Sequence, residues 1–148
     1  MADGALTLVD SNVLIDVATS DPAWFEWSSA ALAEAGDHGG LAINPIILAE
    51  VAADYLTDED LDNAVPPDVF RRLPLPFEAS LPAARAFVGH RRRGGGRRGV
   101  LPDFLIGAHA LVAGLPLLTR DAARYRTYFP SLTVIAPDAN RDQGSAQR

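Results

Sequence analysis

The sequence predicts one α/β domain in which helices cover both faces of a parallel sheet. Short apolar segments alternate with helix-like segments, the order in which parallel strands and their crossover helices follow one another. The strand-like segments are apolar throughout, which is typical of strands buried on both faces. The chain of 148 residues has no internal repeat and no long linker, so its size fits a single domain. We expect the domain to span residues 1–137, followed by a polar, disordered tail at 138–148.

Short apolar segments are expected to form the strands of this sheet. Residues 6–9 are a continuous apolar run that stops at Asp10. Residues 72–77 are a weaker candidate, because their prolines lack a backbone donor and confine the segment to an edge or to irregular structure. In chain order the predicted strands are residues 6–9, 41–45, 72–77, 115–119 and 132–136.

The helices are expected in the segments between these strands. Residues 21–36 carry good helix boundaries, with Asp21 as N-cap, Pro22 at the first helical position and Gly36 as stop. Residues 57–70 are acidic and interrupted by prolines, which predicts a short helix, a break and a helical turn. The other predicted helices are residues 12–18, 46–56, 80–93, 101–114 and 120–129.

Composition narrows both the chemistry and the location of the protein. The net charge of −6 argues against a general electrostatic hold on nucleic acid, but not against a local basic patch. All 13 cationic side chains are arginines, so any mechanism that requires lysine is excluded. The absence of cysteine excludes disulfides and thiolate metal sites and fits a reducing compartment. No secretory signal or membrane-length apolar run is visible, so we expect a cytoplasmic protein without membrane contact.

Four acidic residues fall where the predicted chain reaches one edge of the sheet. Asp10 ends the first strand, and Asp121 follows the fourth. Glu50 lies one turn into the helix after the second strand, and Asp103 opens helix 101–114. Asp10, Asp121 and Asp103 each have a structural explanation, as a turn residue, a cap and a charge at a helix N-terminus. Glu50 is harder to explain in this way, because the helix around it is otherwise apolar. Together the four acids predict one acidic site, because ligands of open α/β sheets bind beyond the carboxyl ends of the strands.

Converging carboxylates need a positive charge among them. Two unit charges about 4 Å apart repel each other by about 4 kcal/mol at an effective dielectric constant of about 20. With no lysine in the chain, a divalent cation is the natural counter-ion, and oxygen ligands favour Mg²⁺ or Mn²⁺ over zinc or copper. Such a site suggests hydrolysis of a phosphodiester bond by a water that the metal activates.

Three segments of the chain carry a family resemblance. "LVDSNVLID" (8–16), "ILAEV" (47–51) and "LPDFLIGAHALVAGLPLLTRD" (101–121) resemble, in order, the motifs of the PIN domain and more narrowly of VapC-type toxins from bacterial toxin–antitoxin pairs. The resemblance covers about residues 6–136. It implies a three-layer sandwich with a parallel five-stranded sheet, and an endoribonuclease that depends on Mg²⁺ or Mn²⁺. It also implies RNA as the substrate, a cognate antitoxin as a partner, and a homodimer.

The resemblance assigns roles to individual residues. Asp10, Glu50, Asp103 and Asp121 match the catalytic, metal-binding acids of the family. Family members often carry a further acid a few residues past the last one. The segment "DAARYRTYF" offers none after Asp121, which leaves a second metal position open. The supporting polar residues are Ser11, Asn12 and Thr119.

A run of arginines precedes Asp103. Residues 90–99 read "HRRRGGGRRG", and arginine's planar fork suits phosphate oxygens. The run can therefore be a clamp for an RNA backbone beside the metal. It can equally be a solvated helix end followed by a glycine hinge, since arginines favour helix C-termini. The arginines concerned are Arg91, Arg92, Arg93, Arg97 and Arg98.

The remaining candidates concern packing and partners. The three histidines show no metal-ligand spacing, and we interpret His109 as a packing or interface residue. Trp24, Phe25 and Trp27 lie in one helix and cannot all point inward. The side chains left outside would meet a partner, either a second subunit or an antitoxin helix.

Other α/β classes compete with this interpretation. A receiver domain would also place an aspartate at a strand end, but it needs a later lysine that the chain lacks. A haloacid-dehalogenase-type phosphatase would show Asp-x-Asp after the first strand, and here Asn12 holds the second position. A catalytically silent PIN-like or receiver-like binding module stays open as the alternative to a nuclease.

Overall fold

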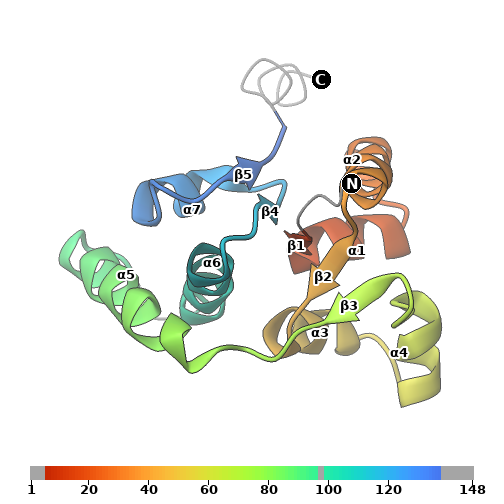
Figure 1. Cartoon of the computed structure of the whole chain (residues 1–148), viewed down its shortest axis with the longest axis horizontal. Coiled ribbons are helices and arrows are strands. Elements are labelled where there is room, and N and C mark those ends of the chain that lie inside the picture. The colour runs from red at the N-terminus through yellow and green to blue at the C-terminus, as the bar shows by residue number, and fades with distance from the viewer. Residues whose placement is uncertain (1–5, 97–98, 138–148) are drawn as a thin grey trace.

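The computed structural model describes residues 6–96 and 99–137, which form a single α/β domain (Figure 1). Its sheet has five strands in the order β3-β2-β1-β4-β5, and all neighbours pair in parallel. The strands are β1 (Thr7–Val9), β2 (Leu41–Ile43), β3 (Phe70–Arg72), β4 (Leu117–Leu118) and β5 (Val134–Ile135). The predicted fold class is confirmed.

Helices cover the sheet on both sides. In Figure 1, α1 and α2 lie on one side of the sheet, and α5, α6 and α7 lie on the other. The helices are α1 (Ser11–Ala18), α2 (Phe25–His38), α3 (Pro45–Ala52), α4 (Asp58–Ala64), α5 (Ser80–Arg92), α6 (Leu101–Ala113) and α7 (Ala122–Tyr128), with a 3₁₀ turn η1 at Phe77–Ala79. Among the helices of the described ranges, none has the length and apolar character needed to cross a membrane. The tail predicted at 138–148 lies outside the described residues.

The core forms around β1, the central strand. Leu8 pairs with Ala42 on one side and with Leu117 on the other, and all three side chains are fully buried. These residues belong to the apolar runs that predicted the strands. Because β1, β2 and β4 are parallel neighbours, the residues that follow them meet at one edge of the sheet.

The third strand lies earlier than predicted. The prediction placed it at residues 72–77, whereas β3 spans Phe70–Arg72 and residues 73–76 form no strand. The last ladder bond runs from the backbone N–H of Leu73 to the carbonyl of Ile43, at 2.9 Å. Pro74 follows and has no N–H to continue the pairing.

The second helix also differs at both ends. It starts at Phe25 instead of Pro22, because Asp21 caps a preceding turn: its Oδ1 accepts from the backbone N–H groups of Ala23 (2.8 Å) and Trp24 (3.0 Å). At the other end the helix runs through Gly36 to His38. Glycine in a helix costs only about 1 kcal/mol relative to alanine, which packing can offset.

A glycine allows close contact between α6 and α7. A Cβ atom at Gly107 would lie 2.7 Å from the ring of Phe129 and 3.1 Å from that of Tyr125. Real Cβ atoms do not approach a ring so closely, so only glycine fits here without displacement. The contact seats the C-terminal segment of the domain, including buried Tyr125, against the sheet edge.

Candidate active site

Asp10 lies at the centre of the candidate site. It follows β1, caps α1 and is only 4% exposed. Its Oδ1 accepts from the backbone N–H of Ser11 at 2.8 Å, and its Oδ2 accepts from Thr119 Oγ1 and from the Tyr125 hydroxyl, both at 2.9 Å. Burial raises the pKa of Asp10 to about 6, and repulsion from Asp103 adds to the rise. The hydrogen bonds oppose that rise because they stabilise the ionised form.

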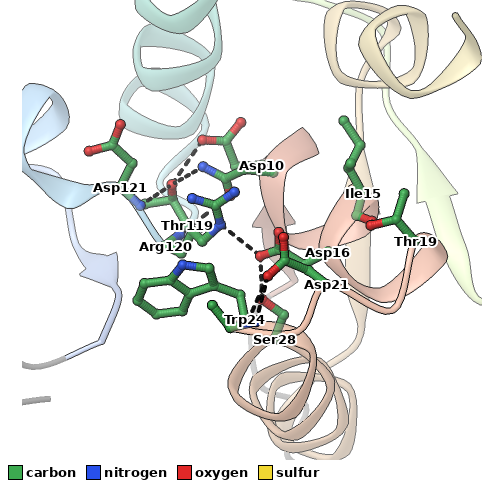
Figure 2. Close-up of polar contacts among 12 residues, drawn as sticks. Asp10, Ile15, Asp16, Thr19, Asp21, Trp24, Ser28, Thr119, Arg120 and Asp121 are labelled. Carbon is green, nitrogen blue, oxygen red and sulfur yellow. Dashed lines mark hydrogen bonds and ion pairs between the residues drawn. The ribbon is translucent and has the colours of Figure 1, made fainter. Parts of the chain in front are cut away.

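Thr119 links the residues that follow β1 and β4. It is fully buried, and its Oγ1 accepts from Asn12 Nδ2 at 3.2 Å and from the backbone N–H of Asp121 at 3.1 Å while it donates to Asp10. Figure 2 shows Thr119 between Asp10 and Asp121. The predicted supporting residues Asn12 and Thr119 therefore hold two of the acids in a fixed relation. The Asp121 side chain itself is exposed.

Glu50 joins the site from α3. Ser11 Oγ donates to its Oε1 at 2.8 Å, which ties α3 to the start of α1. The side chain is exposed, yet partial burial of its carboxyl raises the pKa of Glu50, and repulsion from Asp103 adds to this. The bond from Ser11 opposes both effects. Ser11, predicted as a supporting residue, thus contacts two of the acids.

The start of α3 is fixed by a buried polar pair. Asn44 caps α3 by accepting from the backbone N–H of Ile47 at 2.9 Å, and its Nδ2 lies 2.9 Å from His109 Nδ1. Because the Asn44 amide nitrogen donates, His109 accepts at Nδ1 and carries its proton at Nε2. Burial lowers the pKa of His109, which keeps the ring neutral. His109 is 2% exposed, so of the two predicted roles, packing or interface, the structure supports packing.

Asp103 lies in the first turn of α6 and pairs with an arginine that the sequence did not suggest. Arg124 Nη1 is 2.5 Å from Asp103 Oδ2. Partial burial raises the pKa of Asp103 and repulsion from Asp121 adds to the rise, while Arg124 opposes it. The carboxylate therefore has a positive partner supplied by α7.

The four predicted acids meet at one edge of the sheet without forming a ready-made metal cage. Asp103 raises the pKa values of Asp10 and Glu50, and Asp121 raises that of Asp103, so the charges act on one another. Within residues 6–96 and 99–137, however, no three acidic or imidazole groups lie close enough to hold one ion. Repulsion between the carboxylates favours this separation, and the ion pair with Arg124 stabilises Asp103 in its present position.

Sequence reasoning missed the residues of α7 that contact the acids. The segment "DAARYRTYF" predicts a short helix with no further acid after Asp121, and nothing more. Tyr125 stands four residues after Asp121, which places it on the same helix face, and an aromatic residue at that spacing is the one signal that could have identified it. Nothing local to Arg124 indicates its partner, because Asp103 is 21 residues away in sequence.

A second missed network fixes the loop between β4 and α7. Asp16 is 1% exposed, and its Oδ2 accepts from Arg120 Nε at 2.8 Å and from Ser28 Oγ at 2.9 Å. The Arg120 guanidinium also lies over the Trp24 ring (Figure 2). Its carbon is 5.5 Å from the ring centroid. Arg120 thus ties the loop that carries Thr119 to α1 and α2.

The arginines at the end of α5 are exposed. Arg91 and Arg93 lie over the rings of Phe87 and Tyr128, with 5.9 and 5.2 Å from guanidinium carbon to ring centroid. Arg92 is exposed beside them. Arg97 and Arg98 lie outside the described residues, so the structure describes three of the five arginines in the predicted patch.

The aromatic residues at the start of α2 divide between core and surface. Trp27 packs partly against the core, whereas Phe25 is 39% exposed. Trp24 is half-buried and lies against Arg120. The expectation that the three rings cannot all point inward is confirmed.

Similar folds occur in several toxin–antitoxin complexes. VapBC2 from Rickettsia felis, solved bound to a promoter DNA fragment, has a chain with a TM-score of 0.69 and 15% identity, covering 90% of this chain and 100% of that one. VapBC-1 from nontypeable Haemophilus influenzae has a chain with a TM-score of 0.68 and 17% identity, and the match covers 89% of this chain and 98% of that one. A toxin–antitoxin complex from Klebsiella pneumoniae has a chain with a TM-score of 0.61 and 22% identity, and the match covers 89% of this chain and 98% of that one. At these identities the likeness is one of fold.

Comparison of the sequence itself gives the family. No curated protein sequence matches the chain. The family model of the PIN domain matches residues 7–130, a range that includes all four acids and the described strands β1 to β4. The chain belongs to the PIN domain family.

Proposed function

We propose that this PIN domain is an endoribonuclease that depends on Mg²⁺ or Mn²⁺ and is the toxin of a toxin–antitoxin pair. The observation that carries the proposal is Asp10, a buried carboxylate at the end of the central strand, held by three donors and repelled by Asp103. A buried acid with a raised pKa in such a position is typical of a functional site. The toxin–antitoxin complexes that share the fold support the biological role.

The residues present suit a hard divalent ion. The donors at the sheet edge are carboxylate oxygens, with the hydroxyls of Ser11 and Thr119 bonded to them. Asp10, Glu50, Asp103 and Asp121 would hold the ion after their side chains move closer together, since no three of them lie close enough in the described ranges. When bound, it would supply an activated water and compensate the charge that develops on the phosphate.

The chain's own residues prepare this site. Ser11, Thr119 and Tyr125 orient both oxygens of Asp10 and stabilise its charge. Asn12 holds Thr119, and the shared bond to Thr119 fixes the backbone of Asp121. Such preorganisation lowers the cost of arranging ligands when the substrate arrives.

The proposal includes partners. RNA would be the substrate, with Arg91, Arg92, Arg93, Arg97 and Arg98 contacting its backbone. A cognate antitoxin would bind near the exposed Phe25 and the half-buried Trp24 at the start of α2, and its arginine could occupy the acidic site in place of the metal. A homodimer and a cytoplasmic location belong to the same proposal.

RNA cleavage by the purified protein tests the chemistry. We expect cleavage to require Mg²⁺ or Mn²⁺, to stop in EDTA, and to fall by orders of magnitude in Asp10→Asn and Asp103→Asn. Asp60→Asn, an exposed residue of α4, is the matched control and should cleave as the wild type does. Undiminished cleavage in EDTA would contradict the metal mechanism.

The alternative is a catalytically silent PIN module that only binds. The observation in its favour is the Asp103–Arg124 pair, together with the lack of a formed metal cage in the described part of the chain. Binding of RNA or antitoxin without cleavage in either metal would favour this alternative.

A further inference from the structure

We propose that Arg124 is a substrate-binding residue that exchanges partners. It holds Asp103 while no divalent ion is bound, and it contacts a phosphate oxygen of RNA once an ion occupies the site. The inference rests on the proposed metal-dependent nuclease. It concerns a residue that the sequence motifs did not include.

The geometry places Arg124 at the acids and leaves it able to move. Its Nη1 lies 2.5 Å from Asp103 Oδ2, and the two side chains are 37% and 28% exposed. The neighbouring residue Tyr125 is buried and bonded to Asp10, so the backbone at this point of α7 is fixed. Only the long side chain of Arg124 has to move to change partner.

Charge explains why the partner changes. The carboxylate oxygen that accepts from Arg124 would be needed by a divalent ion, and a guanidinium beside that ion would be repelled by it. A partly exposed ion pair is weak and gives way to a stronger ligand. The released guanidinium would then be free to bind a phosphate oxygen of RNA, which its planar fork suits.

Binding of Mn²⁺ alone tests the first part of the proposal, that Arg124 competes with the ion for Asp103. We would titrate Mn²⁺ into the full chain by calorimetry, comparing wild type with Arg124→Gln and Arg126→Gln. Arg126 is an exposed residue of the same helix, so both variants lose the same charge. We expect Arg124→Gln to bind Mn²⁺ about fivefold more tightly than Arg126→Gln, because one competitor for Asp103 is gone. Circular dichroism should show that both variants are folded.

Binding of RNA tests the second part of the proposal, that Arg124 contacts a phosphate oxygen of the RNA. With Ca²⁺ present to limit turnover, the anisotropy of a labelled single-stranded RNA of mixed sequence should show about fivefold weaker binding by Arg124→Gln than by Arg126→Gln. Equal Mn²⁺ affinity in the two variants would overturn the exchange, and so would equal RNA affinity. If none of the three proteins bound Mn²⁺, the proposed metal site would itself be wrong. That failure differs from one in which wild type binds the ion and Arg124 has no effect.

Discussion

The buried charge of Asp10 lowers the stability of the folded protein, and binding of a cation or a proton would remove this effect. Burial opposes its charge, while Ser11, Thr119 and Tyr125 stabilise it, and the balance leaves a pKa of about 6. Near neutral pH the carboxylate is ionised and destabilises the folded state. Active sites commonly retain such unfavourable groups because function requires them.

The pH dependence of stability should reveal this cost. In the folded protein the pKa of Asp10 is about 6, against 3.8 for an ordinary aspartate. Between these values the folded state binds more protons than the unfolded state, so the free energy of unfolding falls as the pH rises. Asp10→Asn removes this titration. In EDTA, its stability relative to wild type should grow by up to about 3 kcal/mol between acid pH and pH 7.

Urea unfolding at several pH values measures this difference. Asp60→Asn serves as control, because that carboxyl is exposed on α4 and should leave the pH profile as it is in the wild type. A difference between Asp10→Asn and wild type that stays constant from pH 4 to pH 7 would show that Asp10 titrates normally.

At the scale of helices and strands, the sequence predicted the elements whose position depends on local residue patterns. Apolar runs identified the strands around β1, and caps and glycines identified most helices. The prediction for β3 was wrong because Pro74 and Pro76 lie after the strand and mark its end, so they do not weaken its pairing. The acids were found through their place after strands. Arg124 and Tyr125 could not be found in this way, because their partners are distant in sequence and come together only when α7 packs beside α6.

The packing of α7 on α6 should depend on Gly107. In Gly107→Ala the new methyl group would press on the rings of Phe129 and Tyr125, and overpacking of this kind costs about 1–3 kcal/mol. Gly36→Ala is the matched control, because a Cβ there makes only ordinary contacts at 3.8 Å inside α2. It should stabilise the protein by about 0.5–1 kcal/mol through helix propensity. Thermal unfolding of both variants measures the two changes in stability. Equal changes would show that the packing at Gly107 can accommodate a methyl group.

At the scale of the whole molecule, the charge distribution limits how RNA can bind. The chain carries a net charge of −6, which repels a polyanion at long range. The described arginines Arg91, Arg92 and Arg93 gather at the C-terminal end of α5, a helix that packs beside α6. Binding to RNA should therefore rely on this local patch and on any bound cation, and it should weaken quickly as salt screens the patch.

The salt dependence of RNA binding measures what the patch contributes. For a single strand, the slope of log K against log salt concentration is about −0.7 per phosphate neutralised. Arg91→Ala plus Arg92→Ala should flatten the slope by about 1.4 and weaken binding alike across RNA sequences, because backbone contacts carry no base information. Arg71→Ala plus Arg85→Ala removes the same charge from exposed positions on β3 and earlier in α5, and it should leave the slope nearly unchanged. Both pairs are compared in an Asp103→Asn background that prevents cleavage. An equal slope in the two double variants would make the arginines a solvated helix end, and a loss confined to one RNA would mean that they read bases.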